Sequence, residues 1–180
     1  MISGPSGAGK GTLVTRVRER RSNLGLTVSA TTRAPRKGEV DGVNYFFLTR
    51  EEFDRRVANG EFVEWAEVHG NCYGTLVSEV QSKLASGASL ILEIDVQGAL
   101  QVKERFPEAV LIFIKPPSFE VLRERLVGRG TETPETIELR MANAADELAL
   151  ADRYDDVVVN DDLDRATDEL VRVLDMHERI

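Results

Sequence analysis

The sequence predicts an α/β fold in which a parallel sheet is flanked by helices and interrupted by a small mixed-sheet lobe. Short apolar runs, such as residues 89–95, 109–114 and 157–159, alternate with longer amphipathic segments along most of the chain. Strands separated by helices in this way are typical of parallel sheets. Residues 31–72 break the alternation, because short strand-like stretches and turn residues follow each other closely there. This segment predicts the inserted lobe.

Helices are expected where apolar residues recur on one face and where capping residues mark the start. Thr49 and Glu52 have capping-box spacing, and Pro134 stands at a first helical position. The expected helices cover residues 10–21, 49–58, 76–86, 96–106, 118–127, a segment that begins at 133, and 163–177.

Strands are expected where apolar residues alternate or run together between turn signals. Residues 62–68 alternate, which indicates a strand with two different faces, whereas residues 89–95 are almost continuously apolar, as in a central parallel strand. The other expected strands are a stub at 1–3 and the segments 26–30, 43–48, 109–114 and 157–159.

Size and charge limit the class of protein. A chain of 180 residues with 42% hydrophobic residues suits one domain with its own core. The net charge of −8 argues against electrostatic binding to DNA or RNA. The longest apolar runs, such as 111–114, are far shorter than the roughly 20 residues that cross a bilayer, and no signal peptide is recognisable. We therefore expect a cytoplasmic protein without a membrane partner, either a monomer or a homodimer.

A glycine-rich segment between the first strand and the first helix matches the phosphate-binding pattern G-x-x-x-x-G-K. Its residues are Gly4, Pro5, Ser6, Gly7, Ala8, Gly9, Lys10, Gly11 and Thr12. Glycines let backbone N–H groups turn inward toward phosphate oxygens, and the helix start and Lys10 add positive charge. The pattern usually has Ser or Thr after the lysine, but Gly11 stands there. Either Thr12 supplies a hydroxyl to Mg²⁺, or the ion relies on water and carboxylates.

Two further groups of residues indicate a second nucleotide site. Arg33 and Arg36 lie in a segment rich in hydroxyls, and arginine forks match phosphate oxygens. Guanine presents two adjacent donors, N1–H and N2–H₂, beside the acceptor O6. Glu64 can accept from both donors and Thr75 can donate to O6, whereas adenine would leave the carboxylate unpaired. The alternatives are a solvated basic loop and a Glu64 that faces solvent.

Six segments occur together in a fixed order: GPSGAGKGT, SATTRAPRKGEVDGVNYFF, FVEWAEVHGNCYGT, LEIDVQGA, LVGRGTET and VVVND. In this combination the chain resembles the bacterial type of guanylate kinase, within the P-loop nucleoside monophosphate kinases, from Ile2 to about the last helix. The resemblance implies a core at 1–28, 80–122 and 148–180, a GMP-binding lobe at 29–79 and a helical lid at 123–147. The first strand is shorter than in the family, which is compatible with a start upstream.

The resemblance also implies roles for individual residues. Residues 4–12 would bind ATP, with Asn160 near its adenine. The GMP site would consist of Ser29, Arg33, Arg36, Tyr45 and Tyr73 around the phosphate, Glu64 and Thr75 at the base, and Asp95 near the base and the metal. The catalytic residues would be Lys10, Arg33, Asp95 and the lid arginines Arg125, Arg129 and Arg140. Thr12 and Asp95 would hold Mg²⁺, partly through water.

We therefore expect ATP-dependent phosphorylation of GMP, and of dGMP, to GDP or dGDP, in purine nucleotide metabolism and GMP recycling. The small-molecule partners are ATP and GMP, with Mg²⁺ as cofactor. One alternative is a kinase for another nucleotide, such as AMP. The other is a guanylate-kinase-like module that binds peptides without catalysis, although Gly9 and Lys10 are intact here. Arg123 is expected to be an ordinary surface charge.

Overall fold

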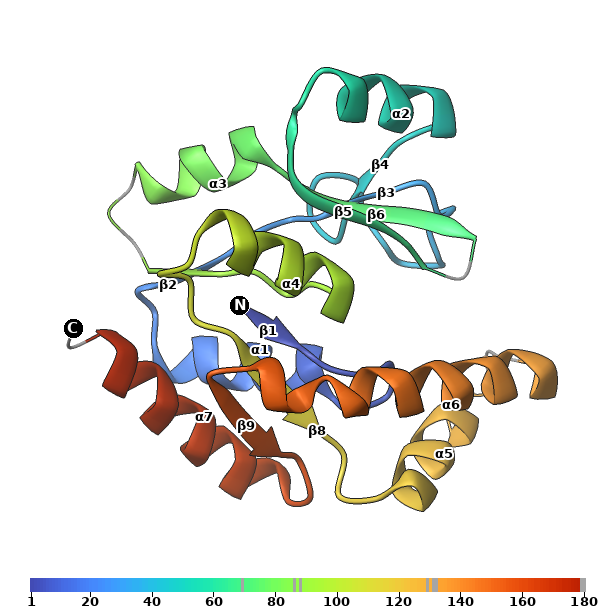
Figure 1. The fold of residues 1–180 in the computed structure, drawn as a ribbon, viewed down its shortest axis with the longest axis vertical. Coiled ribbons are helices and arrows are strands. Elements are labelled where there is room, and N and C mark those ends of the chain that lie inside the picture. The colour runs from blue at the N-terminus through green and yellow to red at the C-terminus, as the bar shows by residue number, and fades with distance from the viewer. Residues whose placement is uncertain (69, 86, 88, 129, 131–132, 179–180) are drawn as a thin grey trace. The chain divides into compact units, whose positions relative to one another are not determined.

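The structure, a computed structural model, describes residues 1–68, 70–85, 87, 89–128, 130 and 133–178 (Figure 1). The chain divides into two units. The first unit combines residues 1–22 with 108–180, and the second consists of residues 23–107. Within the described residues, none of the helices combines the length and apolar character that a bilayer crossing requires.

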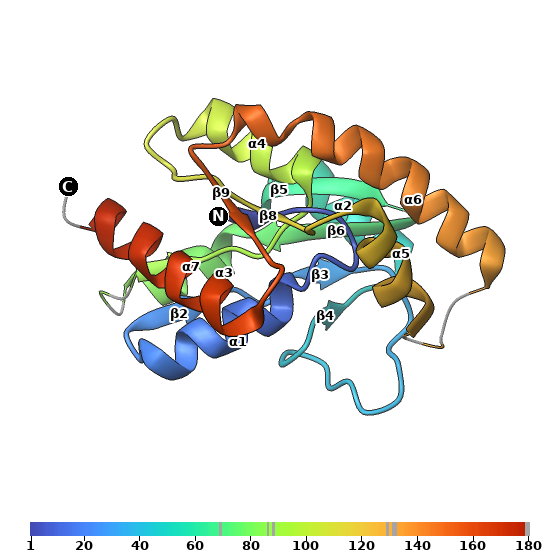
Figure 2. The same ribbon diagram turned by 90° about the horizontal axis from the view of Figure 1, so that it is seen from below.

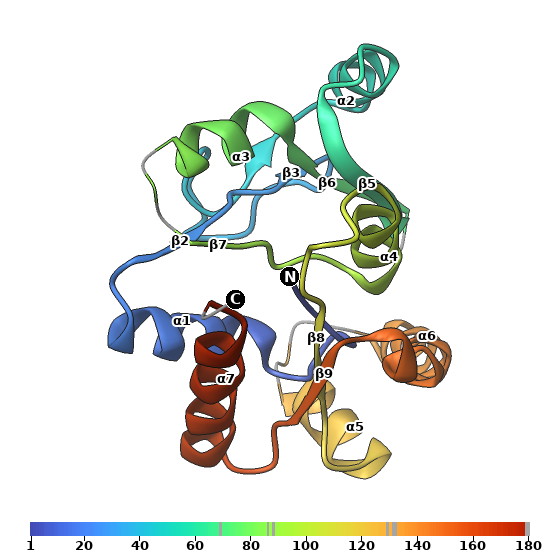
Figure 3. The same cartoon turned by 60° about the vertical axis from the view of Figure 1, so that its left-hand side comes forward.

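The first unit is a parallel sheet with helices on both sides. Its strands have the order β1, β8, β9, and Ile112 of β8 lies opposite Ile2 of β1 and Asp156 of β9. Figures 2 and 3 show this sheet between α6 on one side and α1 and α7 on the other. The elements are β1 (Ile2–Ser3), α1 (Lys10–Arg20), β8 (Ile112–Lys115), α5 (Phe119–Gly128), α6 (Pro134–Ala149), the 3₁₀ turn η1 (Ala151–Arg153), β9 (Asp156–Val159) and α7 (Leu163–Glu178).

Apolar side chains on the sheet and on the inner faces of the helices form the core of this unit. Ile2, Leu13, Phe113 and Leu170 are all fully buried. The apolar run of 157–159 predicts a strand that is buried on both faces, and this expectation is wrong. Val158 is buried, but its neighbours Val157 and Val159 are 39% and 38% exposed, because β9 is an edge strand with one covered face.

The second unit contains the mixed sheet that the sequence predicts. Its strand order is β4, β3, β6, β5, in which β3 pairs with β4 in parallel and with β6 antiparallel, and β5 pairs with β6 antiparallel. A separate parallel pair is formed by β2 and β7. The elements are β2 (Leu24–Leu26), β3 (Ala30–Thr31), β4 (Phe46–Phe47), α2 (Arg50–Ala58), β5 (Phe62–Val68), β6 (Asn71–Leu76), α3 (Val77–Leu84), β7 (Ser89–Ile91) and α4 (Val96–Arg105).

Helix α2 covers one face of the mixed sheet. Phe53 of α2 stacks on Phe62 of β5 with ring centres 4.5 Å apart, and Cys72 and Leu76 of β6 join the same buried cluster. Side chains alternate along a strand, so Tyr73 and Thr75 of β6 lie on the opposite face. The lobe therefore has one face for its core and one face left for a site.

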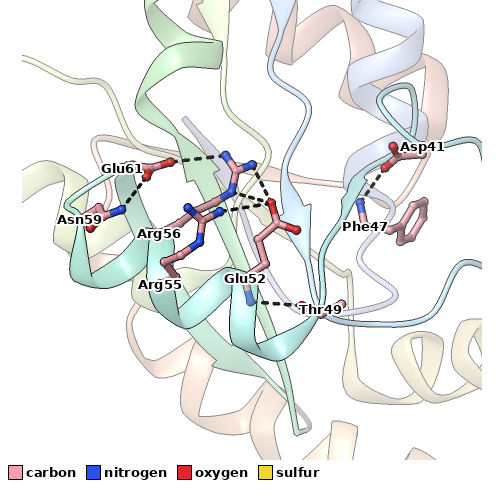
Figure 4. A network of polar contacts seen from close by, with 8 residues as sticks. All are labelled: Asp41, Phe47, Thr49, Glu52, Arg55, Arg56, Asn59 and Glu61. Carbon is pink, nitrogen blue, oxygen red and sulfur yellow. Dashed lines mark hydrogen bonds and ion pairs between the residues drawn. The ribbon is translucent and has the colours of Figure 1, made fainter.

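The start of α2 follows its predicted cap. The Thr49 hydroxyl accepts from the Glu52 amide at 3.1 Å, as Figure 4 shows. Glu52 then accepts from Arg56 at 2.8 Å, and Arg56 also reaches Glu61 at 3.4 Å. These are i,i+4 and end-of-helix pairs, which stabilise a surface helix by only a few tenths of a kcal/mol each, roughly. The predicted start and end of α2 are both confirmed.

Four expected strands are wrong in their extent. Of 43–48 only Phe46–Phe47 form β4, and the strand expected at 109–114 is β8, Ile112–Lys115. The segment 26–30 is split, because Leu26 ends the pairing with β7 whereas Ala30 starts the pairing with β4 and β6 in another sheet. The strand expected at 89–95 ends at Ile91, where its three-residue partner β2 ends. Asp95 instead becomes the N-cap of α4.

Candidate functional site

The glycine-rich segment forms a tight loop between β1 and α1. Gly4 and Gly9 adopt positive φ values of 144° and 92°. A Cβ on Gly4 would lie 2.2 Å from the carbonyl oxygen of Ile114, and a Cβ on Gly9 would lie 2.3 Å from the side-chain nitrogen of Asn160. Both positions therefore exclude any side chain, as the pattern predicts for a phosphate cradle.

Asn160 and Arg125 fasten this loop to the sheet. The amide nitrogen of the buried Asn160 side chain donates to Ala8 O at 2.8 Å. Arg125 donates to Asn160 O at 2.8 Å and to Ala8 O at 3.3 Å. The resemblance implies a place near adenine for Asn160, whereas the contact that the structure shows is its hydrogen bond to the loop. Sequence reasoning missed that role, since 152 residues separate Asn160 from Ala8.

The charged groups of the loop also contact its own backbone. The Lys10 ammonium donates to Gly4 O and, at 3.1 Å, to Pro5 O. Arg140 of α6 donates to the Ser6 hydroxyl. The amino end of α1, with its positive dipole, opens into the loop at Gly9, its N-cap residue. Lysine, arginine and helix dipole thus concentrate positive charge where an anion is expected.

Of the three predicted lid arginines, two reach the loop, namely Arg125 and Arg140. Arg129 lies outside the described residues. Arg123 pairs with Glu138 at the surface, as expected of an ordinary charge. Arg125 lies on α5 and Arg140 lies on α6. The two helices share an apolar cluster of Leu122, Leu126, Ile137, Met141 and Ala144.

The second unit holds the residues expected at the guanine base. Glu64 projects from β5 and is only 3% exposed, and its Oε1 accepts from the hydroxyl of the fully buried Thr75 at 2.7 Å. The alternative that Glu64 faces solvent is therefore wrong. Burial raises the pKa of Glu64 to about 7, with the nearby charge of Asp95 acting in the same direction and the Thr75 hydrogen bond opposing it.

The residues expected at the GMP phosphate form a second group in the same unit. Arg33 donates to both carboxylate oxygens of Glu39 at 2.9 and 3.0 Å, and its guanidinium lies 5.3 Å from the ring centre of Tyr45. Tyr45 and Tyr73 meet edge to face at 6.2 Å. Burial raises the pKa of the Tyr45 hydroxyl, so this group stays protonated and able to donate at neutral pH.

Not every expected phosphate residue joins this group by a side-chain contact. Arg36 is exposed and its backbone N–H donates to Glu39 at 2.6 Å, while the carbonyl of Ser29 accepts from Phe46 in the sheet. Sequence reasoning missed Glu39. Its signal in the sequence is a carboxylate three residues after Arg36. The hydrogen bond from Arg33 lowers the pKa of this carboxyl group.

Asp95 closes the base site at the start of α4. Its Oδ1 accepts from the amides of Gln97 at 2.8 Å and Gly98 at 3.0 Å. Thr12, the other residue expected at a metal, is exposed on the first turn of α1. The part of the chain that the structure describes contains no group of three or more His, Cys, Asp or Glu side chains suited to a metal ion.

The raised pKa of Glu64 predicts how stability depends on pH. Between the unfolded value of 4.5 and about 7, the folded chain binds more protons at Glu64 than the unfolded chain does. The contribution of this residue is thus present below pH 4.5 and is lost as pH rises through 7. We expect the free energy of unfolding of Glu64→Gln, relative to the original chain, to increase by roughly 2–3 kcal/mol across this range. Chemical denaturation at a series of pH values measures it, and parallel curves for the two proteins would contradict it.

Comparison with known proteins shows the family of the chain. The family model described as guanylate kinase matches residues 1–177. The guanylate kinase of Gloeobacter violaceus is 56% identical over 97% of this chain and 85% of its own, and that of Halalkalibacterium halodurans is 52% identical over the same shares. The crystal structure of guanylate kinase from Anaplasma phagocytophilum superposes with a TM-score of 0.80 at 39% identity, covering 97% of this chain and 82% of that one. The chain therefore belongs to the guanylate kinase family.

Proposed function

We propose that this protein catalyses the transfer of the γ-phosphoryl group of ATP to GMP, and to dGMP, in purine nucleotide metabolism and GMP recycling. The observation that carries the proposal is the buried pair of Glu64 and Thr75, 2.7 Å apart. A carboxylate that accepts from N1–H and N2–H₂ selects guanine over adenine, which lacks this donor pair. The single proton of the Thr75 hydroxyl, now donated to Glu64, turns to O6 when the base binds.

The phosphate loop and the arginine–tyrosine group supply the two anion sites. The loop of residues 4–12 and Asn160 receive ATP, with Lys10 on its β- and γ-phosphates. Arg33, Arg36, Tyr45 and Tyr73, together with Ser29, receive the GMP phosphate. Because the Arg33 fork is bound by Glu39, phosphate binding exchanges one anionic partner for another.

The chemistry that these residues perform is positioning and charge stabilisation. The attacking oxygen of GMP is already anionic, so the reaction needs no strong general base. Guanidinium groups of Arg125, Arg129, Arg140 and Arg33 offset the negative charge that spreads over the transferring phosphoryl oxygens. Exclusion of water by closure of a lid then prevents transfer to solvent.

We propose Mg²⁺ as the cofactor. The donors expected for it, the Thr12 hydroxyl and the Asp95 carboxylate, are hard oxygen atoms, which fit this ion. Nucleotide-bound Mg²⁺ usually takes one or two protein carboxylates plus phosphates and water, so a dedicated cage is not required. The bound ion would neutralise charge between the β- and γ-phosphates.

We also propose the three-part organisation implied by the resemblance, with a core at 1–28, 80–122 and 148–180, a GMP lobe at 29–79 and a lid at 123–147. The continuous mixed sheet β4-β3-β6-β5 supports the lobe, and the apolar contact between α5 and α6 supports the lid. A cytoplasmic location follows from the substrates, because the pools of ATP and GMP lie there.

An assay of ADP formation tests the proposed function. The purified protein is incubated with ATP, Mg²⁺ and one of GMP, dGMP, AMP or UMP, and ADP release is coupled to NADH oxidation. We expect turnover with GMP and dGMP and almost none with AMP and UMP. A preference for AMP would contradict the assignment of Glu64 and Thr75. No turnover with any nucleotide would favour the non-catalytic interaction module.

A further inference from the structure

We propose that Gly98, through its lack of a side chain, positions the guanine-reading carboxylate of Glu64 and thereby helps to determine base specificity. This inference rests on the proposed function and concerns a residue outside the nucleotide-contacting set. Helix α4 packs on β5 within the second unit, and Gly98 lies in its first turn. The glycine gives Glu64 room to occupy its buried place.

The close approach is steric and specific to one position. A Cβ built on Gly98 would lie 2.3 Å from Oε2, 3.0 Å from Cδ and 3.5 Å from Cγ of Glu64. Real Cβ atoms do not approach other atoms to 2.3 Å, so any side chain at residue 98 displaces the carboxylate or the helix. The backbone does not explain the glycine, since residue 98 has ordinary helical geometry. Alanine there would favour the helix by about 1 kcal/mol.

Two side chains of α4 fix the helix against the strand at this point. Gln101 donates to the carbonyl of Trp65 at 3.1 Å, and Arg105 donates to the carbonyl of Val63 at 2.8 Å. Val63 and Trp65 are the two neighbours of Glu64 on β5. Residues 98, 101 and 105 are spaced three and four apart, so they share one face of α4. The helix cannot slide away from the carboxylate without breaking these bonds.

The carboxylate itself has little freedom to move. Before the base binds, the Thr75 hydroxyl donates to Oε1 at 2.7 Å, and Oε2 points at Gly98. Asp95 caps the same turn by accepting from the amides of Gln97 and Gly98. A methyl group at residue 98 therefore changes the direction of the carboxylate that must face N1–H and N2–H₂ of guanine. Recognition of the base is expected to weaken while the phosphate loop in the other unit is unchanged.

The test is Gly98→Ala, assayed by steady-state kinetics with GMP and with IMP, which lacks the 2-amino group. We expect KM for GMP to rise about tenfold or more, the loss of roughly one charged hydrogen bond. KM for ATP is expected to stay within about twofold, and the preference for GMP over IMP in kcat/KM to fall about tenfold. An unchanged GMP KM and an unchanged preference in an active enzyme would overturn the proposal.

A matched control and a rescue separate positioning from general damage. Glu104→Ala replaces an exposed side chain of the same helix α4 and should leave every parameter unchanged. Glu64→Asp withdraws the carboxylate by one methylene. In the double variant Gly98→Ala/Glu64→Asp, the alanine should therefore add almost nothing to the effect of the aspartate.

The folding of the two variants and the activity of the original chain also test the positioning role. If Gly98→Ala fails to fold, the shortened side chain of the double variant should restore folding, as read from its thermal midpoint. Additive penalties, or a double variant that still fails to fold, would overturn the positioning role. If the original chain shows no GMP turnover, the proposed function is wrong, and the inference that rests on it fails with it.

Discussion

Replacement of Lys10 by alanine is expected to lower kcat for GMP phosphorylation by about 10²–10³-fold, the usual cost of removing one group that stabilises charge in the transition state. Lys10 begins α1, and its ammonium lies within the loop, where it donates to Gly4 O and Pro5 O. The ammonium is a point charge that can exchange these carbonyls for phosphate oxygens of ATP. Because the substitution removes no buried apolar side chain, the fold should persist.

The measurement is steady-state kinetics beside a thermal unfolding curve. Lys83→Ala is the matched control, since Lys83 lies on α3, outside the proposed nucleotide sites, and pairs with Glu79 at 3.5 Å. That control should retain full turnover, because the ammonium it removes has no role at the phosphates. A Lys10→Ala protein with more than about a tenth of the original kcat would be incompatible with its role at the phosphates.

Local signals predicted several elements with their boundaries. The strand β5 agrees with the alternating pattern of residues 62–68, α2 follows its Thr49 cap, and α6 begins at Pro134 after its cap Thr133. For the two helices the determinant is the side chain of the cap residue, and for β5 it is the alternation of buried and exposed side chains. Hydrogen bonds of this kind form within three or four residues, so a sequence displays them directly.

Strand ends depended on partners far along the chain and were less predictable. The run 89–95 is apolar to its end, yet β7 stops at Ile91 because β2 offers three residues to pair with. Likewise β4 contains only Phe46 and Phe47, because β3 beside it is two residues long. Apolar character marks burial, whereas the extent of a strand is set by the length of its neighbour.

In the candidate site, the types of the functional residues were predictable from the sequence, whereas their contacts were not. Residue types alone led to the loop, the arginines and the pair Glu64 and Thr75, because each matches a group on a nucleotide. Three features required the structure: the fork of Arg33 held by Glu39, the loop fastened by Asn160, and the space beside Glu64 at Gly98. In all three, the sequence names the residues but does not show that they lie in contact.

Replacement of Glu64 by glutamine is expected to raise the KM and Kd for GMP by about 10²–10³-fold, because two hydrogen bonds to a charged acceptor are lost. The amide of glutamine can accept from only one guanine donor, and its own NH₂ group would face the other. At 3% exposure the site offers little water to replace the lost partner. Binding of ATP should be unchanged, since the residues expected to hold it lie in the other unit.

Calorimetric titration with GMP and with ATP separates the two effects. The matched control is Glu67→Gln on the same strand, because Glu67 is exposed and pairs with Arg50 at 3.2 Å. It makes the same chemical change three residues away and should alter neither affinity by more than about twofold.

The pH profile adds an independent check. With a Glu64 pKa of about 7, the original chain should bind GMP more tightly as pH rises from 6 to 8, because only the carboxylate form accepts from both guanine donors. Glu64→Gln has no such proton to lose, so it should keep only the pH dependence that comes from the second ionisation of the GMP phosphate, at about pH 6. A profile identical to that of the original chain would place the titrating group elsewhere.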